Sequence, residues 1–178
     1  MKIKDLVFQQ FINKSKIQQK VRELAGKIDA DYAGRTPLFL PILNGSFIFA
    51  ADLIKQIEGP CKVSFVKIAS YSGTTSSGQL KTLLGLEESL FNQDILIVED
   101  IVDTGLTLKK IVDELKSLGT RSVEVISLLR KQPAREKSIE VKYVGFEIED
   151  EFVLGYGMDY DGLGRNYKDI FKAKNPAS

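Results

Sequence analysis

The sequence contains no histidine, no tryptophan and a single cysteine, Cys61. Without histidine the chain cannot build the Ser-His-Asp or Cys-His machinery of many hydrolases. It also lacks the residue that most zinc sites and most general bases at neutral pH use. One cysteine cannot form an internal disulfide or a CxxC redox site, which favours a cytoplasmic location. Any catalysis must therefore rely on carboxylates, lysines, hydroxyls, backbone amides and bound ions.

The chain also lacks an excess of charge of either sign. Its 25 basic and 24 acidic residues give a net charge of +1, so we expect neither nucleic acid nor a membrane as a partner. There is no apolar run of about 18 residues, and the first residues lack the apolar core of a signal peptide. A length of 178 residues, of which 43% are hydrophobic, fits one domain spanning residues 1–178.

Short apolar runs alternate with amphipathic segments along the chain. Helices are predicted at 15–32, 47–57 and 106–118, with Ser15 and Gln18 forming a capping box at the start of the first. Strands are predicted at 38–43, 63–68, 94–98, 122–129, 141–148 and 152–155, and a loop at 70–78. This alternation predicts an α/β fold with a mostly parallel central sheet flanked by helices. In such sheets the ligand lies beyond the carboxyl ends of the strands.

The most informative stretch directly follows the apolar strand at 94–98. Residues 99–107 read Glu-Asp-Ile-Val-Asp-Thr-Gly-Leu-Thr, so two acids end the strand and a third precedes a small-residue turn into a helix. A helix that begins after such a turn directs free backbone amides at an anion and binds phosphate. Adjacent carboxylates can hold a magnesium ion or the two hydroxyls of a ribose. The pattern fits a ligand that carries both a sugar and a phosphate.

The acidic turn, and three residues further along the chain that are candidates for ligand binding, also have an ordinary structural interpretation. Asp103 could be the N-cap of an acidic helix start whose other acids are solvated. Lys131, in the pair Arg130-Lys131, could be a solvated lysine, and Phe152 and Val153 could be core residues of a strand. The acids nevertheless follow a buried strand without a break, and this position favours a binding site over a solvated turn.

Residues 94–107 resemble the phosphoribosyl pyrophosphate signature of the type I phosphoribosyltransferases: an apolar strand, two acids, two apolar residues, then Asp-Thr-Gly-x-Thr. A second stretch, Phe-Val-Leu-Gly-Tyr-Gly-Met-Asp-Tyr at 152–160, has Arg165 six residues after Asp159. It is similar to the purine-salvage members of the family, which act on hypoxanthine and guanine. The resemblance runs from about residue 8 to residue 170.

The resemblance implies the fold of that family, with a core at about 35–150, a small hood from residues 1–34 and 150–178, and a flexible lid loop. It implies a magnesium-dependent transfer of ribose 5-phosphate from phosphoribosyl pyrophosphate to hypoxanthine or guanine, with pyrophosphate as the leaving group. It also implies a homodimer or a homotetramer. A transfer through an oxocarbenium-like transition state needs no covalent nucleophile, which agrees with the absence of histidine.

By the same resemblance, the acidic turn binds the donor. Glu99 and Asp100 face the ribose hydroxyls and a magnesium ion. Asp103 contacts the donor and takes or shares a proton at purine N7, a general-base role worth about 10²–10⁴-fold in rate. The next residues of the turn match the cradle of the 5-phosphate: Thr104, Gly105, Leu106 and Thr107.

Pyrophosphate contacts are implied at three further places in the chain. Asp159 matches a ligand of a second magnesium ion, and Arg165 matches an anion contact. Asn44 and Gly45 follow the strand at 38–43, in a turn where many members carry lysine in place of Asn44. The pair Ser70-Tyr71 opens the lid loop, which would close over pyrophosphate and exclude water.

Purine recognition is implied for Lys131, Phe152, Val153 and Asp159. Lys131 matches a lysine that donates to the 6-oxo group of the purine. It would select 6-oxopurines over adenine, because an ammonium only donates hydrogen bonds. Phe152 matches a ring that stacks on the base, and Val153 presents a backbone carbonyl to the edge of the base.

Two other functions fit parts of the sequence. Asp103-Thr104-Gly105 is also the active-site tripeptide of aspartic proteases, but a protease with one copy would be an all-β homodimer, and the predicted helix argues against it. A non-catalytic regulator on the same fold could sense phosphoribosyl pyrophosphate without turnover. The presence of Asp103 and the low net charge favour the enzyme over this regulator.

Overall fold

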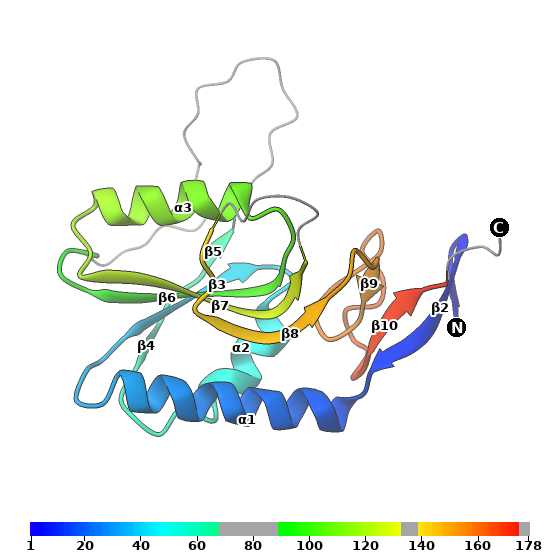
Figure 1. Cartoon of the computed structure of the whole chain (residues 1–178), viewed down its shortest axis with the longest axis horizontal. Coiled ribbons are helices and arrows are strands. Elements are labelled where there is room, and N and C mark those ends of the chain that lie inside the picture. Colours follow the sequence, from blue (N-terminus) through cyan, green and yellow to red (C-terminus); the bar gives the residue numbers. More distant parts are fainter. Residues whose placement is uncertain (68–88, 133–138, 175–178) are drawn as a thin grey trace, which may run out of the picture.

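The computed structural model describes residues 1–67, 89–132 and 139–174, which form two β-sheets and three helices (Figure 1). The larger sheet has the order β4-β3-β6-β7-β8, with β5 also paired to β3, and all of these pairs are parallel. Its strands are β3 (Leu38–Leu43), β4 (Lys62–Val63), β5 (Val66–Lys67), β6 (Asp94–Val102), β7 (Ser122–Lys131) and β8 (Tyr143–Ile148). The predicted α/β class with a mostly parallel sheet is confirmed.

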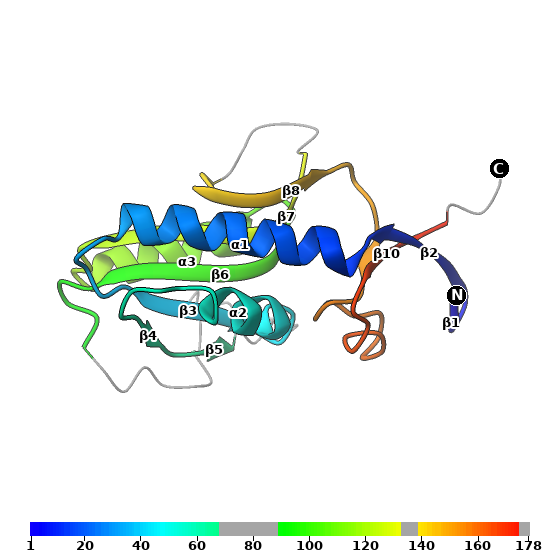
Figure 2. The same ribbon diagram turned by 90° about the horizontal axis from the view of Figure 1, so that it is seen from below.

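Helices cover both faces of this sheet (Figures 1 and 2). α1 (Lys14–Asp31) and α2 (Phe47–Ile54) lie on one face, and α3 (Leu106–Ser117) lies on the other. Side chains of β6 alternate between the two cores. Leu96 and Val98 pack with residues of α1 and α2, whereas Ile95 and Ile97 pack with residues of α3. Since successive residues of a strand point to opposite faces, a strand covered on both faces must be continuously apolar.

A second, antiparallel sheet has the order β1-β2-β10-β9 and lies beyond the carboxyl end of β8 (Figure 1). Its strands are β1 (Lys2–Ile3), β2 (Leu6–Ile12), β9 (Val153–Leu154) and β10 (Ile170–Ala173). Pairing of β2 with β10 joins the two ends of the chain, and the sequence patterns did not predict these two strands or β1. The predicted hood segment 1–34 contributes to both parts of the fold. Its strands β1 and β2 join the small sheet, whereas α1 packs against α2 and β8.

The predicted N-cap of the first helix, Ser15, is wrong by two residues. Asn13 is the N-cap, and its Oδ1 accepts a hydrogen bond of 3.0 Å from Lys16 N. Ser15 is already helical, so it forms no capping box with Gln18. The Gln18 side chain instead donates to Asp52 on α2, at 2.7 Å. The Gln18 side chain thus bonds to a residue of another helix, whereas the capping box would have directed it to the backbone of its own helix start.

Other predicted boundaries also shift. α2 ends at Ile54, three residues early, since the backbone tightens into bonds between residues three apart before Gly59. The predicted strand at 63–68 is two short strands, β4 and β5, within the described residues. β6 is longer than predicted because Glu99 and Ile101 continue its pairing with β7, opposite Ser127 and Leu129. Glu99 and Asp100 therefore lie among the last residues of the strand rather than after it.

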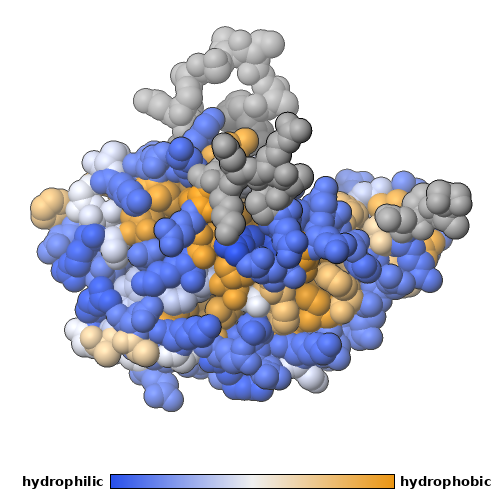
Figure 3. Space-filling model, in the orientation of Figure 1, coloured by the Kyte–Doolittle hydropathy of each residue, from blue (hydrophilic) through white to orange (hydrophobic). Residues whose placement is uncertain are grey.

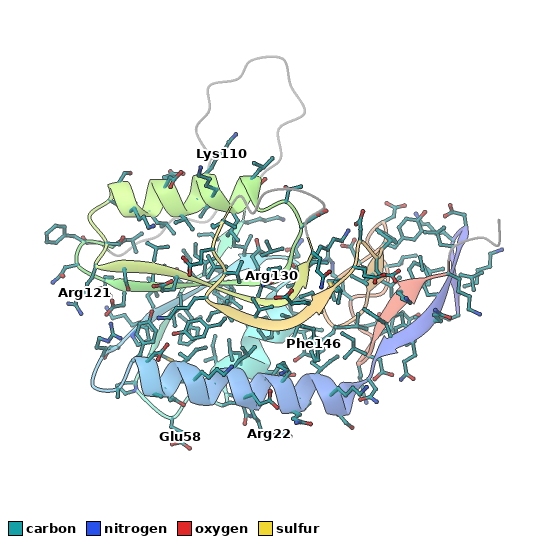
Figure 4. All side chains as sticks on the ribbon, viewed as in Figure 1. Arg22, Glu58, Lys110, Arg121, Arg130 and Phe146 are labelled. Carbon is teal, nitrogen blue, oxygen red and sulfur yellow. The ribbon has the colours of Figure 1, made fainter. Side chains whose placement is uncertain are left out.

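The surface shown in Figure 3 is mostly polar, with apolar residues gathered in the band between α1 and α3 where the strands lie. Phe146 on β8, labelled in Figure 4, is part of this band, and Lys20 Nζ lies 5.7 Å from the centroid of its ring. The lysine stem of α1 thereby covers some of the apolar surface. No helix in the described ranges is both long enough and apolar enough to cross a membrane.

Candidate active site

The acidic turn lies at the carboxyl end of β6, in the centre of the parallel sheet. Glu99 and Asp100 are in the strand, and the chain then passes through Asp103 into α3. Gly105 has a φ of 72° and is the N-cap of that helix, a conformation that glycine adopts without steric strain. The predicted strand, turn and helix are thus present in the predicted order, and the site faces the edge where ligands bind in such sheets.

The two strand acids are partly buried and repel one another. Burial and then the charge of Asp100 raise the pKa of Glu99 well above its usual value. Burial also raises the pKa of Asp100. A hydrogen bond of 2.9 Å from Ile101 N and the positive charge of Arg165 oppose that shift only in part. A ligand with positive charge or with hydroxyl donors would relieve the energetic penalty of ionising this pair.

Glycines let two other segments approach these acids. Gly45, in the turn after β3, lies against the Asp100 carboxylate so closely that a Cβ atom would overlap it. Gly157, with a φ of 104°, lies in the same way against the carbonyl oxygen of Gly45. Asn44 precedes Gly45 and is joined to Leu43 by a cis peptide bond. Backbone of the 44–45 turn and of the 155–158 segment therefore borders the acidic end of β6.

The turn from β6 into α3 exposes several groups to solvent. The side chain of Asp103 is 67% exposed and that of Leu106 is also exposed. The backbone amide of Leu106 donates to Thr104 Oγ1 at 3.5 Å, and Thr107 lies in the first turn of α3. The amides of a first helical turn have no partner within the helix, so this turn is able to bind an anion.

Lys131 ends β7 and lies beside the acidic turn. Its Nζ is 3.6 Å from Asp103 Oδ2 and 2.6 Å from Asp150 Oδ1. Burial lowers the pKa of Lys131, but the hydrogen bond to Asp150 and the charge of Asp103 outweigh burial, so the pKa lies above its usual value. The lysine is therefore a permanent cation at neutral pH that connects the β6 turn to the segment before β9.

Asp150 was not among the predicted site residues. It lies two residues before the motif at 152–160, and its partner Lys131 is 19 residues away along the chain. No local pattern signals that contact.

Phe152 and Val153, which follow Asp150 closely in the chain, differ in exposure. Phe152 is 45% exposed, and its ring meets that of Tyr160 edge-on at 5.5 Å and that of Phe8 at 6.2 Å. Val153 is buried and pairs with Lys172 of β10. A partly exposed ring held by two others is suited to stacking on a flat ligand.

Asp159 and Arg165 form an ion pair at 2.6 Å in the segment after β9. Arg165 Nη1 also donates to the carbonyl of Gly157 at 2.7 Å, and Gly162 N donates to Asp159 at 2.7 Å. The charge of Arg165 reaches Asp100, whose pKa it lowers. The structure thus brings the second sequence motif to the first. Ser70 and Tyr71 lie outside the described residues.

A divalent cation fits the donor set of this site. No group of three or more acidic, cysteine or histidine side chains that could hold a metal occurs in the described part of the chain. Magnesium in such sites uses one or two carboxylates and completes its shell with water and substrate oxygens. The partly buried Glu99 and Asp100, whose ionised forms burial disfavours, supply carboxylates of this kind.

Comparisons with known proteins agree with this geometry. The family model of the phosphoribosyl transferase domain matches residues 9–161. The hypoxanthine-guanine phosphoribosyltransferase of Staphylococcus aureus is 44% identical over 84% of this chain and 84% of its own length. A solved structure of a mutant hypoxanthine phosphoribosyltransferase from Trypanosoma cruzi, complexed with the product IMP, is 32% identical with a TM-score of 0.87. It covers 98% of this chain and 93% of that protein.

The bifunctional protein TilS/HprT of Listeria innocua is 42% identical over 87% of this chain, which spans only 24% of that longer relative. None of these relatives is a protease, and the Asp-Thr-Gly tripeptide lies in a strand-to-helix turn of a parallel sheet rather than in an all-β fold. The chain belongs to the phosphoribosyltransferase family and, within it, to the hypoxanthine-guanine phosphoribosyltransferases.

Proposed function

We propose that the chain transfers ribose 5-phosphate from phosphoribosyl pyrophosphate to hypoxanthine or guanine, releasing pyrophosphate and forming IMP or GMP. The observation that carries this proposal is the meeting of three parts at one sheet edge. These are the partly buried acids of β6, the anion-binding turn into α3, and the cationic Lys131, whose Nζ lies 3.6 Å from Asp103 Oδ2. The S. aureus relative bears the name of this activity, and the structure of the T. cruzi relative is a complex with the product IMP.

The donor is held from two sides. The backbone of Gly105 and Leu106 and the hydroxyls of Thr104 and Thr107 bind the 5-phosphate, because a helix start presents donors to an anion. Glu99 and Asp100 accept hydrogen bonds from the ribose hydroxyls. These bonds fix the sugar so that its anomeric carbon faces the purine.

The purine is held by the groups beyond the turn. Lys131 donates to the 6-oxo group, Phe152 stacks on the ring and the Val153 carbonyl accepts from the edge of the base. Asp103, which is exposed and adjacent to Lys131, takes or shares the N7 proton as the ring nitrogen attacks.

The leaving pyrophosphate is bound by Arg165, by the Asn44-Gly45 turn and by Ser70-Tyr71. Glu99 and Asp100 would hold one magnesium ion and Asp159 a second, and magnesium, when bound, neutralises charge on the phosphate oxygens. Arg165 lies within reach of both Asp159 and Asp100, and this position supports a role between the metal ligands and the anion.

The decisive assay mixes the purified chain with magnesium, phosphoribosyl pyrophosphate and one purine at a time. We expect IMP from hypoxanthine and GMP from guanine, with adenine a much poorer acceptor. Absence of both products would overturn the proposed function, and binding of the donor without turnover would favour the regulator instead. Faster use of adenine would remove Lys131 from purine selection.

We also propose that the enzyme works in the cytoplasm, as a homodimer or homotetramer, and that residues 1–178 form one domain. The single cysteine supports the cytoplasmic location. Small molecules are the proposed substrates, which the name of the S. aureus relative supports. Light scattering of the purified chain measures the oligomeric state, and a monomeric mass would refute that part of the proposal.

A further inference from the structure

Asp52, on α2, joins three parts of the fold although it lies outside the sequence motifs. Its Oδ2 accepts hydrogen bonds from the Tyr156 hydroxyl and from Gln18 Nε2, both at 2.7 Å. Its Oδ1 lies 2.9 Å from Lys55 Nζ. Tyr156 follows β9 and Gln18 lies on α1, so one carboxylate connects both helices of one face to the segment between β9 and β10.

Tyr156 is held in a conformation that needs such support. Its φ is 52°, in the left-handed region, and it lies between Gly155 and Gly157, whose φ values are also positive. A residue with a Cβ atom in this region is strained by about 1 kcal/mol or more. The side chain is 3% exposed, and the backbone amide donates to Tyr167 O at 2.8 Å. Burial and then the hydrogen bond to Asp52 raise the pKa of Tyr156, so its hydroxyl remains a donor.

The residue after Tyr156 touches the candidate site. Gly157 lies against the carbonyl oxygen of Gly45, the glycine that borders Asp100. The Gly157 carbonyl accepts from Arg165 Nη1 at 2.7 Å, and its amide donates to Arg165 O at 3.0 Å. Arg165 is in turn paired with Asp159 at 2.6 Å. Gly157, the residue after the buried tyrosine, therefore contacts both Arg165 and the Gly45 turn, so its position fixes theirs.

We infer that Asp52 is a positioning residue for the pyrophosphate side of the site. It acts through the Tyr156 hydroxyl and holds Gly157, Arg165 and the Gly45 turn in their relative positions. This inference rests on the proposed function for the identity of the ligand. Neither Asp52 nor Tyr156 contacts substrate in this scheme. Their effect falls on pyrophosphate and on the pyrophosphate part of the donor, while purine and 5-phosphate contacts come from α3, β7 and β9.

A second tyrosine offers a matched control. The Tyr143 hydroxyl donates to Asp31 Oδ2 at 2.6 Å, and Tyr143 is 4% exposed, so the bond and its burial resemble those of Tyr156 and Asp52. Asp31 is at the far end of α1 from Gln18, about 20 Å along the helix at a rise of about 1.5 Å per residue. Loss of this hydroxyl removes a similar bond away from the site.

The test compares Tyr156→Phe with Tyr143→Phe in the full chain. Titration calorimetry measures the affinity for pyrophosphate with magnesium, for phosphoribosyl pyrophosphate with magnesium, and for IMP, and thermal unfolding measures stability. We expect Tyr156→Phe to bind the two pyrophosphate ligands more weakly, on the order of tenfold, and to bind IMP as the unmodified chain does. Tyr143→Phe should leave all three affinities unchanged at a comparable loss of Tm.

Substitutions of Asp52 add a rescue experiment. Asp52→Asn keeps an oxygen that can accept the Tyr156 hydroxyl, so it should retain most of the pyrophosphate affinity, whereas Asp52→Ala should match Tyr156→Phe. Unchanged pyrophosphate affinity in folded Tyr156→Phe, or an equal loss in Tyr143→Phe, would overturn the inference. If the unmodified chain binds the donor but forms neither IMP nor GMP, the proposed function fails, while the comparison of the two tyrosines still decides the role of Asp52.

Discussion

Replacement of Gly45 by alanine tests whether the close approach of the 44–45 turn to β6 is required. A Cβ atom at this position would lie 2.5 Å from Asp100 Cγ and 2.9 Å from its Oδ1. Non-bonded atoms of different residues do not approach so closely, so either the Asp100 side chain must rotate or the turn must move. Both routes disturb groups to which we assign donor binding.

The magnitude follows from what each route gives up. Rotation of Asp100 breaks its hydrogen bond from Ile101 N, and bonds to charged groups are worth about 1.5–3 kcal/mol. Movement of the turn resembles overpacking of a core, which costs about 1–3 kcal/mol. For a chain of this size each kcal/mol lowers Tm by about 2–4 °C, so we expect a loss of roughly 5 °C. Affinity for the donor should fall as well, since the turn borders both Asp100 and Gly157.

Thermal unfolding and calorimetric titration with magnesium and phosphoribosyl pyrophosphate measure the two effects. Gly26→Ala is the matched control, because Gly26 is inside α1 and a Cβ atom there would meet nothing within 4 Å. That change should stabilise the chain by about 1 kcal/mol without altering affinity. A Gly45→Ala variant that keeps both the Tm and the donor affinity of the unmodified chain would show that the close contact is dispensable.

Three further predictions concern individual charges of the site. Asp103→Asn should keep donor binding and lower turnover by about 10²-fold, measured by steady-state kinetics; unchanged turnover would remove Asp103 from proton transfer. Lys131→Met should lose most of the preference for 6-oxopurines over adenine, while Lys142→Met, which removes an ion pair with Asp31, should not. Glu99→Gln should raise the Tm of the ligand-free chain at pH 7, because burial raises the folded-state pKa of Glu99 above the usual 4.5 and so penalises the ionised form. This penalty is present above the folded pKa and disappears as the pH falls towards 4.5, so the Tm difference should shrink on acidification, and a constant difference would contradict the argument.

The sequence by itself determined the central βα unit and the class of fold. The apolar run ending in Glu99-Asp100, followed by a glycine turn, is a local pattern in which burial on both faces and helix initiation act on neighbouring residues. The strand at 38–43 was predicted with its observed bounds for the same reason. The family, which the match to its model confirms, followed from such segments, and they also predicted the ligand site at the carboxyl edge of the sheet.

Only the tertiary structure decided how distant segments complete the site. Lys131 meets Asp150 across 19 residues, Asp52 meets Tyr156 across 104, and β2 pairs with β10 from opposite ends of the chain. The Gln18 side chain, which the capping-box pattern assigned to the local backbone, likewise donates to Asp52 of another helix. Local periodicity reports which face of an element is buried, but the partner of a polar side chain depends on which elements pack together. The acids of the motif are thus visible in the sequence, whereas the contacts that hold the second motif against them arise only in the folded chain.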